Sequence, residues 1–343
     1  MENPYLSTAR DEETLAYELR STPDEAIAKL ASGSYKLVKK TSGAKRKRFT
    51  AKDDIFLGWL YKFKLATATD LSVVARVKPE TAYKRFLGLE GVGLVKRLPV
   101  WNAETQWTLT REGARYLGDT RWTTRTLPES ILHTKVVNHV AANLAAGNHT
   151  VLGLPPRVFI TDTSLGMKWL TSEFEIQRSL GYVRQSMKKD ELRTMLRREY
   201  RERMSAWWQA NGALPYPVWE RGEEWQAAII PPFNKLGAYH VPDLVLRRTR
   251  YSLDYAADVA IEVETSVKKE RDYRRIMDVY RSDFFSRAEP PLYSSVVWLC
   301  RHSATYSSLS TMAEKMGLLG TKVVVEWVRD SEGNRAGADW WKY

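Results

Sequence analysis

The C-terminal third of the chain alternates short apolar runs with amphipathic segments. The apolar runs have the length and the β-branched content of buried strands, and the segments between them have the period of helices. In the longest segment Tyr273, Ile276, Met277 and Tyr280 share one helix face, while most of the arginines lie elsewhere. Strands that alternate with helices predict an α/β sheet. The predicted strands span residues 241–248, 257–264, 293–300 and 321–328, and the predicted helices span residues 266–284 and 304–316.

A different order of elements is predicted between residues 50 and 118. Thr50 or Asp53 caps a first helix, and Pro79 stands where a third helix begins, because its missing N–H costs nothing in the first turn. Two short strands and a closing turn of helix follow. This order is typical of a winged helix-turn-helix. The predicted second helix spans residues 69–77, the strands span residues 94–100 and 106–109, and the closing turn spans residues 111–116.

The remaining segments are less regular. The N-terminal arm contains one predicted helix and ends in a basic run, and further on a helix is predicted over residues 129–144 and a short strand near residues 158–160. A basic helical insertion follows between about residues 181 and 235. Its arginines and tryptophans either grip a nucleic-acid strand or form a solvated helix capped by core tryptophans. The predicted domains are the arm, residues 1–49, a winged helix, residues 50–120, and an α/β domain, residues 121–343, which makes the chain α+β overall.

Composition and charge restrict the partner. The chain has 343 residues, of which 43% are hydrophobic and 27% are charged, so it can bury the cores of two or three domains. Its net charge of +12 and its clustered basic residues favour a polyanion, with nucleic acid as the leading candidate. No apolar run approaches the roughly 18 residues of a membrane span, and the acidic N-terminus does not resemble a signal peptide. We therefore expect a cytoplasmic protein without a membrane partner, whose single cysteine, Cys300, is buried and inert.

Residues in and before the predicted winged helix are the candidate DNA contacts. The third predicted helix buries its apolar positions and leaves Thr81, Tyr83, Lys84 and Arg85 for a groove of duplex DNA. The basic run of Lys45, Arg46, Lys47 and Arg48 suits a flexible arm on phosphates. Both sets also have an explanation without DNA. The residues of the third helix can be an ordinary solvated helix face, and the basic run can be a solvated linker. A winged helix is also compatible with a homodimer, although no heptad or symmetric patch requires one.

Acidic residues gather near residue 243 and again in a strand that follows. Asp243 precedes an apolar run, and in the strand over residues 257–264 the side chains alternate. Glu262 and Glu264 therefore project together, away from the face that turns to a core. Their repulsion, at about 7 Å and an effective dielectric of about 20, is about 2 kcal/mol, which a core strand has no reason to bear. A turn can bring Asp243 alongside them, and a bound cation would explain the cluster.

Three carboxylates at one end of a hairpin suit a hard divalent cation. Mg²⁺ or Mn²⁺ takes oxygen ligands, keeps several waters and can bind two or three carboxylates together with a substrate phosphate. Such an ion polarises the phosphate and lowers the pKa of a bound water, which becomes the nucleophile for phosphodiester hydrolysis. Other enzyme classes lack their motifs: the chain has no Walker loop, and His133 and His139 do not form the histidine pair of a tyrosine relaxase.

These acidic residues resemble the PD-(D/E)xK nuclease superfamily. Pro242-Asp243 resembles its first element and Glu262-Val263-Glu264 its second, and the match covers the C-terminal half of the chain. With the preceding winged helix, the layout resembles the replication-relaxation proteins of actinobacterial plasmids and phages, which pair the same two modules. The resemblance implies a restriction-endonuclease-like α/β fold with a mixed sheet. It also implies that Glu173 or Glu175 supplies the additional acid that some members bring from an upstream element.

One position departs from the superfamily pattern. Glu264 stands where its lysine belongs, and Lys268 or Lys269, in the first turn of the next predicted helix, can reach back to the site. Cations in a first turn oppose the helix dipole by about 0.3–1 kcal/mol, so these lysines need a compensating partner. An ion pair between Glu264 and Lys268 would supply that partner without any catalysis.

Two interpretations of function follow. In the first, the chain is a Mg²⁺-dependent DNA endonuclease or nickase in plasmid or phage replication. Asp243, Glu262 and Glu173 hold the metal, Glu264 assists, and Lys268 or Lys269 orients water or stabilises charge on the phosphate. In the second, the chain is a catalytically inactive DNA-binding regulator or replication-accessory protein, which the missing lysine favours.

Overall fold

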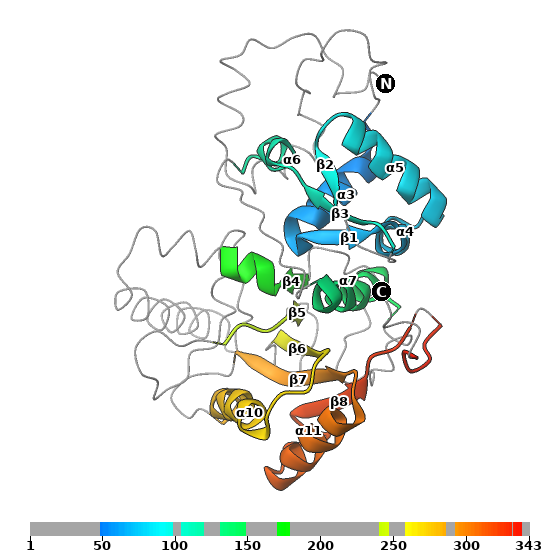
Figure 1. Ribbon diagram of the computed structural model, residues 1–343. Helices are drawn as coiled ribbons and strands as arrows, with labels where there is room; N and C mark the ends of the chain where they lie inside the picture. The colour runs from blue at the N-terminus through cyan, green and yellow to red at the C-terminus, as the bar shows by residue number, and fades with distance from the viewer. Residues whose placement is uncertain are drawn as a thin grey trace, which may run out of the picture. The chain divides into compact units, whose positions relative to one another are not determined.

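The computed structural model describes residues 49–98, 104–119, 131–148, 170–178, 240–246, 258–285, 292–330 and 332–337. These residues form helices and two β-sheets, so the chain is of mixed α and β structure (Figure 1). None of their helices is long and apolar enough to cross a membrane. Several predicted features lie outside the described residues: the helix of the N-terminal arm, the basic run of Lys45, Arg46, Lys47 and Arg48, the strand near residues 158–160, and the insertion at about residues 181–235.

The chain divides into two compact units. The division falls between Asn138 and His139, inside helix α7 (Ile131–Ala146). This helix lies close to the one predicted over residues 129–144.

The N-terminal unit combines helices with a small antiparallel sheet. Its elements are α3 (Ala51–Phe63), β1 (Leu65–Thr67), α4 (Ala68–Ala75), α5 (Pro79–Gly91), β2 (Val95–Leu98), β3 (Gln106–Leu109) and α6 (Arg111–Tyr116). The helices, β2 and β3 lie within a few residues of their predicted positions. The sequence does not predict β1, because a strand of three residues between two helices is too short to show an alternation of apolar and polar residues. It pairs with β3, which also pairs with β2.

Short-range signals set the helix ends in this unit. Thr67 and Asp70 form reciprocal hydrogen bonds at the start of α4: Asp70 N donates to Thr67 Oγ1 at 3.0 Å, and Thr67 N donates to Asp70 Oδ2 at 3.0 Å. Pro79 is the first residue of α5, as predicted. Gly93 has a φ of 78°, the left-handed conformation that lets the chain turn from α5 into β2.

Aromatic rings fill the centre of the N-terminal unit. Phe86 and Trp107 stack with their ring centroids 4.9 Å apart and an interplanar angle of 4°, and the centroid of Phe56 lies 5.1 Å from that of Phe86. All three side chains are fully buried. Burying a side chain of this kind contributes roughly 1.5–3 kcal/mol, so the rings join α3, α5 and β3 into one core.

The C-terminal unit is built on a five-stranded mixed sheet with the order β4-β5-β6-β7-β8. Strand β5 is antiparallel to β4 and to β6, whereas β6, β7 and β8 are parallel. Helices α10 and α11 connect the parallel strands, as the alternation of strand and helix predicts. The strands are β4 (Leu170–Ser172), β5 (Leu244–Leu246), β6 (Asp258–Glu264), β7 (Tyr293–Cys300) and β8 (Val323–Trp327), and the helices are α10 (Glu270–Phe284) and α11 (Ser303–Lys315).

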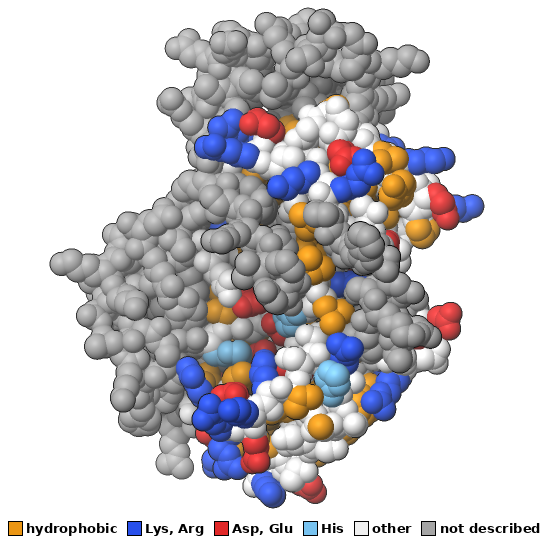
Figure 2. Space-filling model, viewed as in Figure 1, with side chains coloured by type: hydrophobic (Ala, Val, Ile, Leu, Met, Phe, Trp, Pro, Cys, Tyr) orange, Lys and Arg blue, Asp and Glu red, His pale blue; other side chains and the backbone are white. Residues whose placement is uncertain are grey.

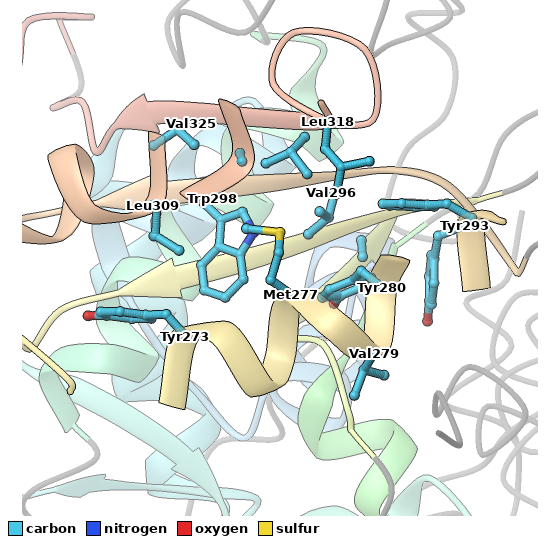
Figure 3. Packing of buried hydrophobic residues seen from close by; sticks show 14 of the residues in the cluster. Tyr273, Met277, Val279, Tyr280, Tyr293, Val296, Trp298, Leu309, Leu318 and Val325 are labelled. Carbon is cyan, nitrogen blue, oxygen red and sulfur yellow. The ribbon is translucent and has the colours of Figure 1, made fainter. Parts of the chain in front are cut away.

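The main core of this unit lies between the sheet and the two connecting helices (Figure 3). It contains apolar residues of α10 and α11, together with Ala260 of β6 and Trp298 of β7. Because side chains alternate along β6, Glu262 and Glu264 lie on the same face as Ala260. The expectation that the two glutamates point away from the core is therefore wrong. Strand β6 is buried along its whole length, since a parallel strand in the middle of a sheet is covered on both faces.

Helix α10 begins later than the sequence predicts. Its first residue is Glu270, Lys269 is the residue before it, and its first turn carries the acids Glu270 and Asp272. The expectation that Lys268 and Lys269 lie in the first turn is therefore wrong. The acids there interact favourably with the helix dipole, which the lysines would have opposed.

Cys300, at the end of β7, is buried as predicted. Burial, with a smaller contribution from the charge of Glu264, raises the pKa of its thiol to about 12. A thiol that stays protonated is a poor nucleophile, so Cys300 is a core residue.

Asp70 makes the stability of the N-terminal unit depend on pH. Burial raises the pKa of Asp70 from 3.8 to about 7, although its hydrogen bonds with Thr67 oppose the rise. Between these values the folded unit holds a proton that the unfolded chain has released, so stability is greatest below about pH 4 and is lost as the pH rises to about 7. We expect Asp70→Asn, which keeps an oxygen for Thr67, to remove a slope of up to about 1.4 kcal/mol per pH unit.

The measurement is urea unfolding of wild type and variant between about pH 5 and 8, followed by tryptophan fluorescence. Glu112→Gln, at an exposed acid of α6, is the matched control and should leave the slope unchanged. Parallel pH dependences for wild type and Asp70→Asn would show that Asp70 does not titrate in this range.

Candidate functional site

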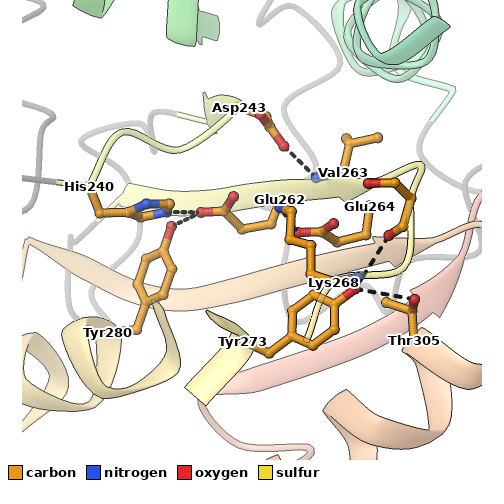
Figure 4. Close-up of polar contacts among 10 residues, drawn as sticks. His240, Asp243, Glu262, Val263, Glu264, Lys268, Tyr273, Tyr280 and Thr305 are labelled. Carbon is orange, nitrogen blue, oxygen red and sulfur yellow. Dashed lines mark hydrogen bonds and ion pairs between the residues drawn. The ribbon is translucent and has the colours of Figure 1, made fainter. Parts of the chain in front are cut away.

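Asp243 is held at the edge of β5 by a backbone group of β6. It comes one residue before Leu244, which pairs with Ile261. Its carboxylate oxygen Oδ2 accepts a hydrogen bond from the Val263 N–H at 2.6 Å (Figure 4). The Asp243 side chain is half-buried. The first acid of the predicted site therefore lies beside the acidic strand, in a position that the backbone of that strand maintains.

Glu173 lies next to Asp243 on the β4 side. It follows β4 directly, and its backbone N–H donates to the Asp243 carbonyl oxygen at 2.9 Å, which extends the pairing of Ser172 with Leu244. A carboxylate oxygen of Glu173 lies within 4.8 Å of one of Asp243, and both side chains are half-buried. Two carboxylates at this separation repel each other when both are charged, so a cation between them would be stabilising.

Glu175, the alternative upstream acid, caps a helix. Residues 173–178 are helical, and Ser172 precedes them. The Glu175 N–H donates to Ser172 Oγ at 3.1 Å, and the Ser172 N–H donates to Glu175 Oε2 at 3.2 Å. This reciprocal arrangement is a capping box. Of the two glutamates, Glu173 is the one that lies beside Asp243.

Glu262 is buried and accepts hydrogen bonds from two side chains. Its Oε1 accepts from His240 Nε2 at 2.5 Å and from the Tyr280 hydroxyl (Figure 4). Burial alone would lower the pKa of His240, but the charge and the hydrogen bond of Glu262 outweigh it, and the pKa is raised. Burial, followed by the charge of Glu262, raises the pKa of Tyr280 well above its usual value, so its hydroxyl remains a donor. Glu262 therefore has two hydrogen-bond partners on separate segments of the chain.

Glu264 forms an ion pair with Lys268. Lys268 Nζ lies 2.5 Å from Glu264 Oε1, and the Lys268 backbone N–H donates to the Tyr273 hydroxyl at 2.9 Å. Burial raises the pKa of Glu264 to about 7, with smaller contributions from Asp243 and Glu262, while Lys268 opposes the rise. Burial would lower the pKa of Lys268, but the charge of Glu264 outweighs it and raises that pKa. Lys268 therefore stays cationic beside a carboxylate that readily takes up a proton.

The predicted acids do not form a single ligand set. Among the described residues, Asp243, Glu262 and Glu264 do not bring their carboxylate oxygens within 4.8 Å of one another as a group. Val263 N holds Asp243, whereas Glu262 and Glu264 lie on the face of β6 that α10 covers. The acids that the structure brings together are Glu173 and Asp243. Lys269 is exposed and, among the described residues, forms no ion pair.

The predicted DNA contacts in α5 differ in their exposure. Thr81, Tyr83 and Lys84 are exposed. The guanidinium of Arg85 forms an ion pair with Asp53 at 3.0 Å, and Asp53 is fully buried in the first turn of α3. Arg85 therefore joins α5 to α3 and is less available for a phosphate than the sequence suggests.

His240 and Tyr280 are the site residues that the sequence prediction misses. His240 stands three positions before Asp243, and a histidine so close to the first acid was a usable signal. The spacing of apolar residues places Tyr280 on the buried face of its helix and gives it no polar role. Its hydroxyl meets Glu262 only when α10 packs on the sheet, so no local pattern could reveal that contact.

No protein-family model matches the chain, and no match was found among curated proteins or solved structures.

The Tyr280 hydroxyl should contribute measurably to the stability of the C-terminal unit. Tyr280→Phe removes a donor to a buried carboxylate, so we expect the free energy of unfolding to fall by roughly 1–3 kcal/mol. Chemical unfolding followed by circular dichroism measures the change. Tyr306→Phe is the matched control, because among the described residues the Tyr306 hydroxyl forms no hydrogen bond while its ring stacks on Trp327. Equal losses in the two variants would argue against the Glu262 contact.

Proposed function

We propose that this protein binds duplex DNA through its N-terminal unit and hydrolyses phosphodiester bonds with a divalent cation held by Glu173 and Asp243. The observation that carries the proposal is the approach of these two half-buried carboxylates, at the ends of adjacent strands, to within 4.8 Å. The resemblance to replication-relaxation proteins supports a role in plasmid or phage DNA processing.

The residues fit a hard cation. Mg²⁺ and Mn²⁺ prefer carboxylate oxygens and keep several waters, so a site of two carboxylates leaves room for a substrate phosphate. When bound, such an ion supplies polarisation of the phosphate and a coordinated water of lowered pKa. Glu173 and Asp243 bring the ligand oxygens from β4 and β5, and Val263 N keeps the Asp243 carboxylate in position.

Lys268 contributes the positive charge that the superfamily pattern places two residues after Glu262. Its side chain is 41% exposed, while Glu264, its partner, is buried. The lysine can therefore turn to a phosphate oxygen at the surface. Glu264 is able to take up a proton when its partner leaves, because burial raises its pKa to about 7. The ion pair thus keeps the Lys268 ammonium near the acids. When Lys268 turns to a phosphate, protonation of Glu264 avoids an unpaired buried carboxylate.

The elements of the N-terminal unit support DNA binding. The elements follow in the order α3, β1, α4, α5, β2 and β3, which is compatible with a winged helix-turn-helix whose recognition helix is α5. Lys84 and Tyr83 are exposed on α5, and Tyr83 packs edge-on against the buried Trp107 with their centroids 6.1 Å apart. This packing against a buried ring holds α5 in a fixed position, which a recognition helix needs if its exposed polar residues are to contact DNA. The restriction-endonuclease-like assignment of the C-terminal unit is supported by its mixed sheet, with Asp243 directly before β5 and Glu262 on the adjacent strand β6.

A second candidate function is DNA binding without cleavage. It is favoured by the contacts of Glu262 with His240 and of Glu264 with Lys268, which already neutralise two of the acids. Under this alternative the protein would bind DNA equally well with and without divalent ions.

Asp243→Asn and Glu173→Gln should abolish metal-dependent cleavage. We expect each to lower the rate of supercoiled plasmid nicking in Mg²⁺ or Mn²⁺ by about 100-fold or more, and to weaken Mn²⁺ binding measured by calorimetry without DNA. Each keeps the size of the side chain and removes its charge. Asp272→Asn, at an exposed acid of α10, is the control and should retain full activity.

The outcomes of this assay separate the two functions. Nicking that is lost in both site variants and retained in the control supports the hydrolase. Nicking that the site variants leave unchanged would remove Glu173 and Asp243 from the reaction. Absence of nicking by the wild type, together with DNA binding in EDTA, would favour the non-cleaving protein.

Lys84→Ala should weaken DNA binding at the N-terminal unit. Loss of one phosphate contact should reduce the slope of log K against log salt concentration by about 1, measured by fluorescence anisotropy in EDTA. Arg111→Ala removes another exposed charge, from α6, and is the matched control. An equal loss in both variants would indicate a general charge effect and would exclude α5 as the contact surface.

A further inference from the structure

A groove runs between the exposed sides of α10 and α11. It has a volume of about 490 Å³ and is lined along α10 by Arg274, Asp278 and Arg281 and along α11 by Ser307, Thr311 and Lys315, among others. Figure 2 shows Lys and Arg side chains gathered over α10, with acidic side chains among them. The groove lies on the outer side of α10, whereas Tyr280 on the inner side contacts Glu262. It is therefore separate from the acids of the candidate site.

The basic residues of the groove differ in how far they are neutralised. Arg274 forms an ion pair with Glu270 at 3.0 Å. Among the described residues, no carboxylate lies within ion-pair distance of Arg281 or Lys315, although both line the groove. The acids Glu270 and Asp278 also line the groove, so its lining carries three cations and two carboxylates. The excess of positive charge lies with Arg281 and Lys315, and an anionic ligand would supply a partner for both.

The spacing of the cations suits an extended anion. Arg274 and Arg281 are seven residues apart on one helix face, which corresponds to about 10.5 Å along the axis. A compact anion cannot reach both ends of this length, whereas an extended chain of phosphates can. Asp278 lies between the two arginines in sequence and also lines the groove. It would repel a compact anion, but the sugars that separate successive phosphates are neutral.

The remaining polar side chains are suited to the same ligand. Ser307, Ser308 and Thr311 line the α11 side, and their hydroxyls can donate to phosphate oxygens without adding charge. Most contacts between proteins and DNA go to phosphate and sugar, from Arg and Lys and from the hydroxyls of Ser and Thr. The groove contains these residue types on two facing helices.

We propose that the groove between α10 and α11 binds the phosphodiester backbone of DNA, as a second contact in addition to that of α5. The inference rests on the DNA-binding part of the proposed function and not on cleavage. It adds an anchoring surface to the C-terminal unit, so that both units hold the nucleic acid.

The test compares the full-length wild type with two double variants in a DNA-binding assay in EDTA. Arg281→Ala with Lys315→Ala removes the two unneutralised cations of the groove. We expect the Kd for a fluorescent duplex to rise roughly tenfold or more at 0.1 M salt, and the salt slope to fall by about 2. Arg271→Ala with Arg275→Ala removes the same charge from exposed positions of α10 outside the groove and is the matched control.

A charge-preserving variant separates a binding role from a folding role. Arg281→Lys with Lys315→Arg should bind within about twofold of the wild type, since phosphate contacts are maintained mainly by charge. Equal losses in the groove variant and the matched control would overturn the inference, and so would loss of binding in the charge-preserving variant. A wild type that does not bind DNA would overturn both this inference and the DNA-binding part of the proposed function. Loss of nicking alone, with the binding differences intact, would affect only the hydrolase.

Discussion

Burial of two carboxylates in one strand is the constraint on which the C-terminal unit depends. Glu262 and Glu264 are 4% and 2% exposed, and an isolated charge at such a position costs several kcal/mol. The partners that make the burial tolerable come from separate segments: His240 precedes β5, Lys268 precedes α10, and Tyr280 lies within α10. Each pairing therefore ties a different part of the chain to β6. The acids help to determine where α10 lies on the sheet.

The same constraint divides the acidic residues into two groups with different chemistry. Glu262 and Glu264 have a histidine and a lysine as partners, and their contacts resemble those of a structural network. Glu173 and Asp243 are half-buried, close to each other, and held by backbone bonds at the junction of β4, β5 and β6. A pair of carboxylates that approach closely can share a proton or a cation. The hydrolytic hypothesis is stronger for this pair than for the glutamates of β6.

The sequence predicted the periodic elements well and the orientation of their side chains less well. Pro79 and the apolar spacing of α5 gave its start and its buried residues, because a single helix packing on a core leaves a clear period. In β6 the alternation placed Glu262 and Glu264 on one face but could not identify that face, since both faces are covered. The role of Arg85 was also hidden, because its partner Asp53 lies in another helix. The pairing of Glu173 with Asp243 came only from a family resemblance, since no local period links positions so far apart in the chain.

Net charge alone is a poor guide to where a polyanion binds, because many cations are already neutralised within the fold. Arg85 is paired with Asp53, Arg274 with Glu270 and Lys268 with Glu264. What attracts a phosphate is a cation whose charge no neighbouring acid balances, on a surface that presents several groups together. By this criterion exposed Lys84 on α5, and Arg281 with Lys315 between α10 and α11, are stronger candidates than Arg85. The excess of +12 limits the class of partner, and the ion pairs within each unit determine which of its basic residues can meet that partner.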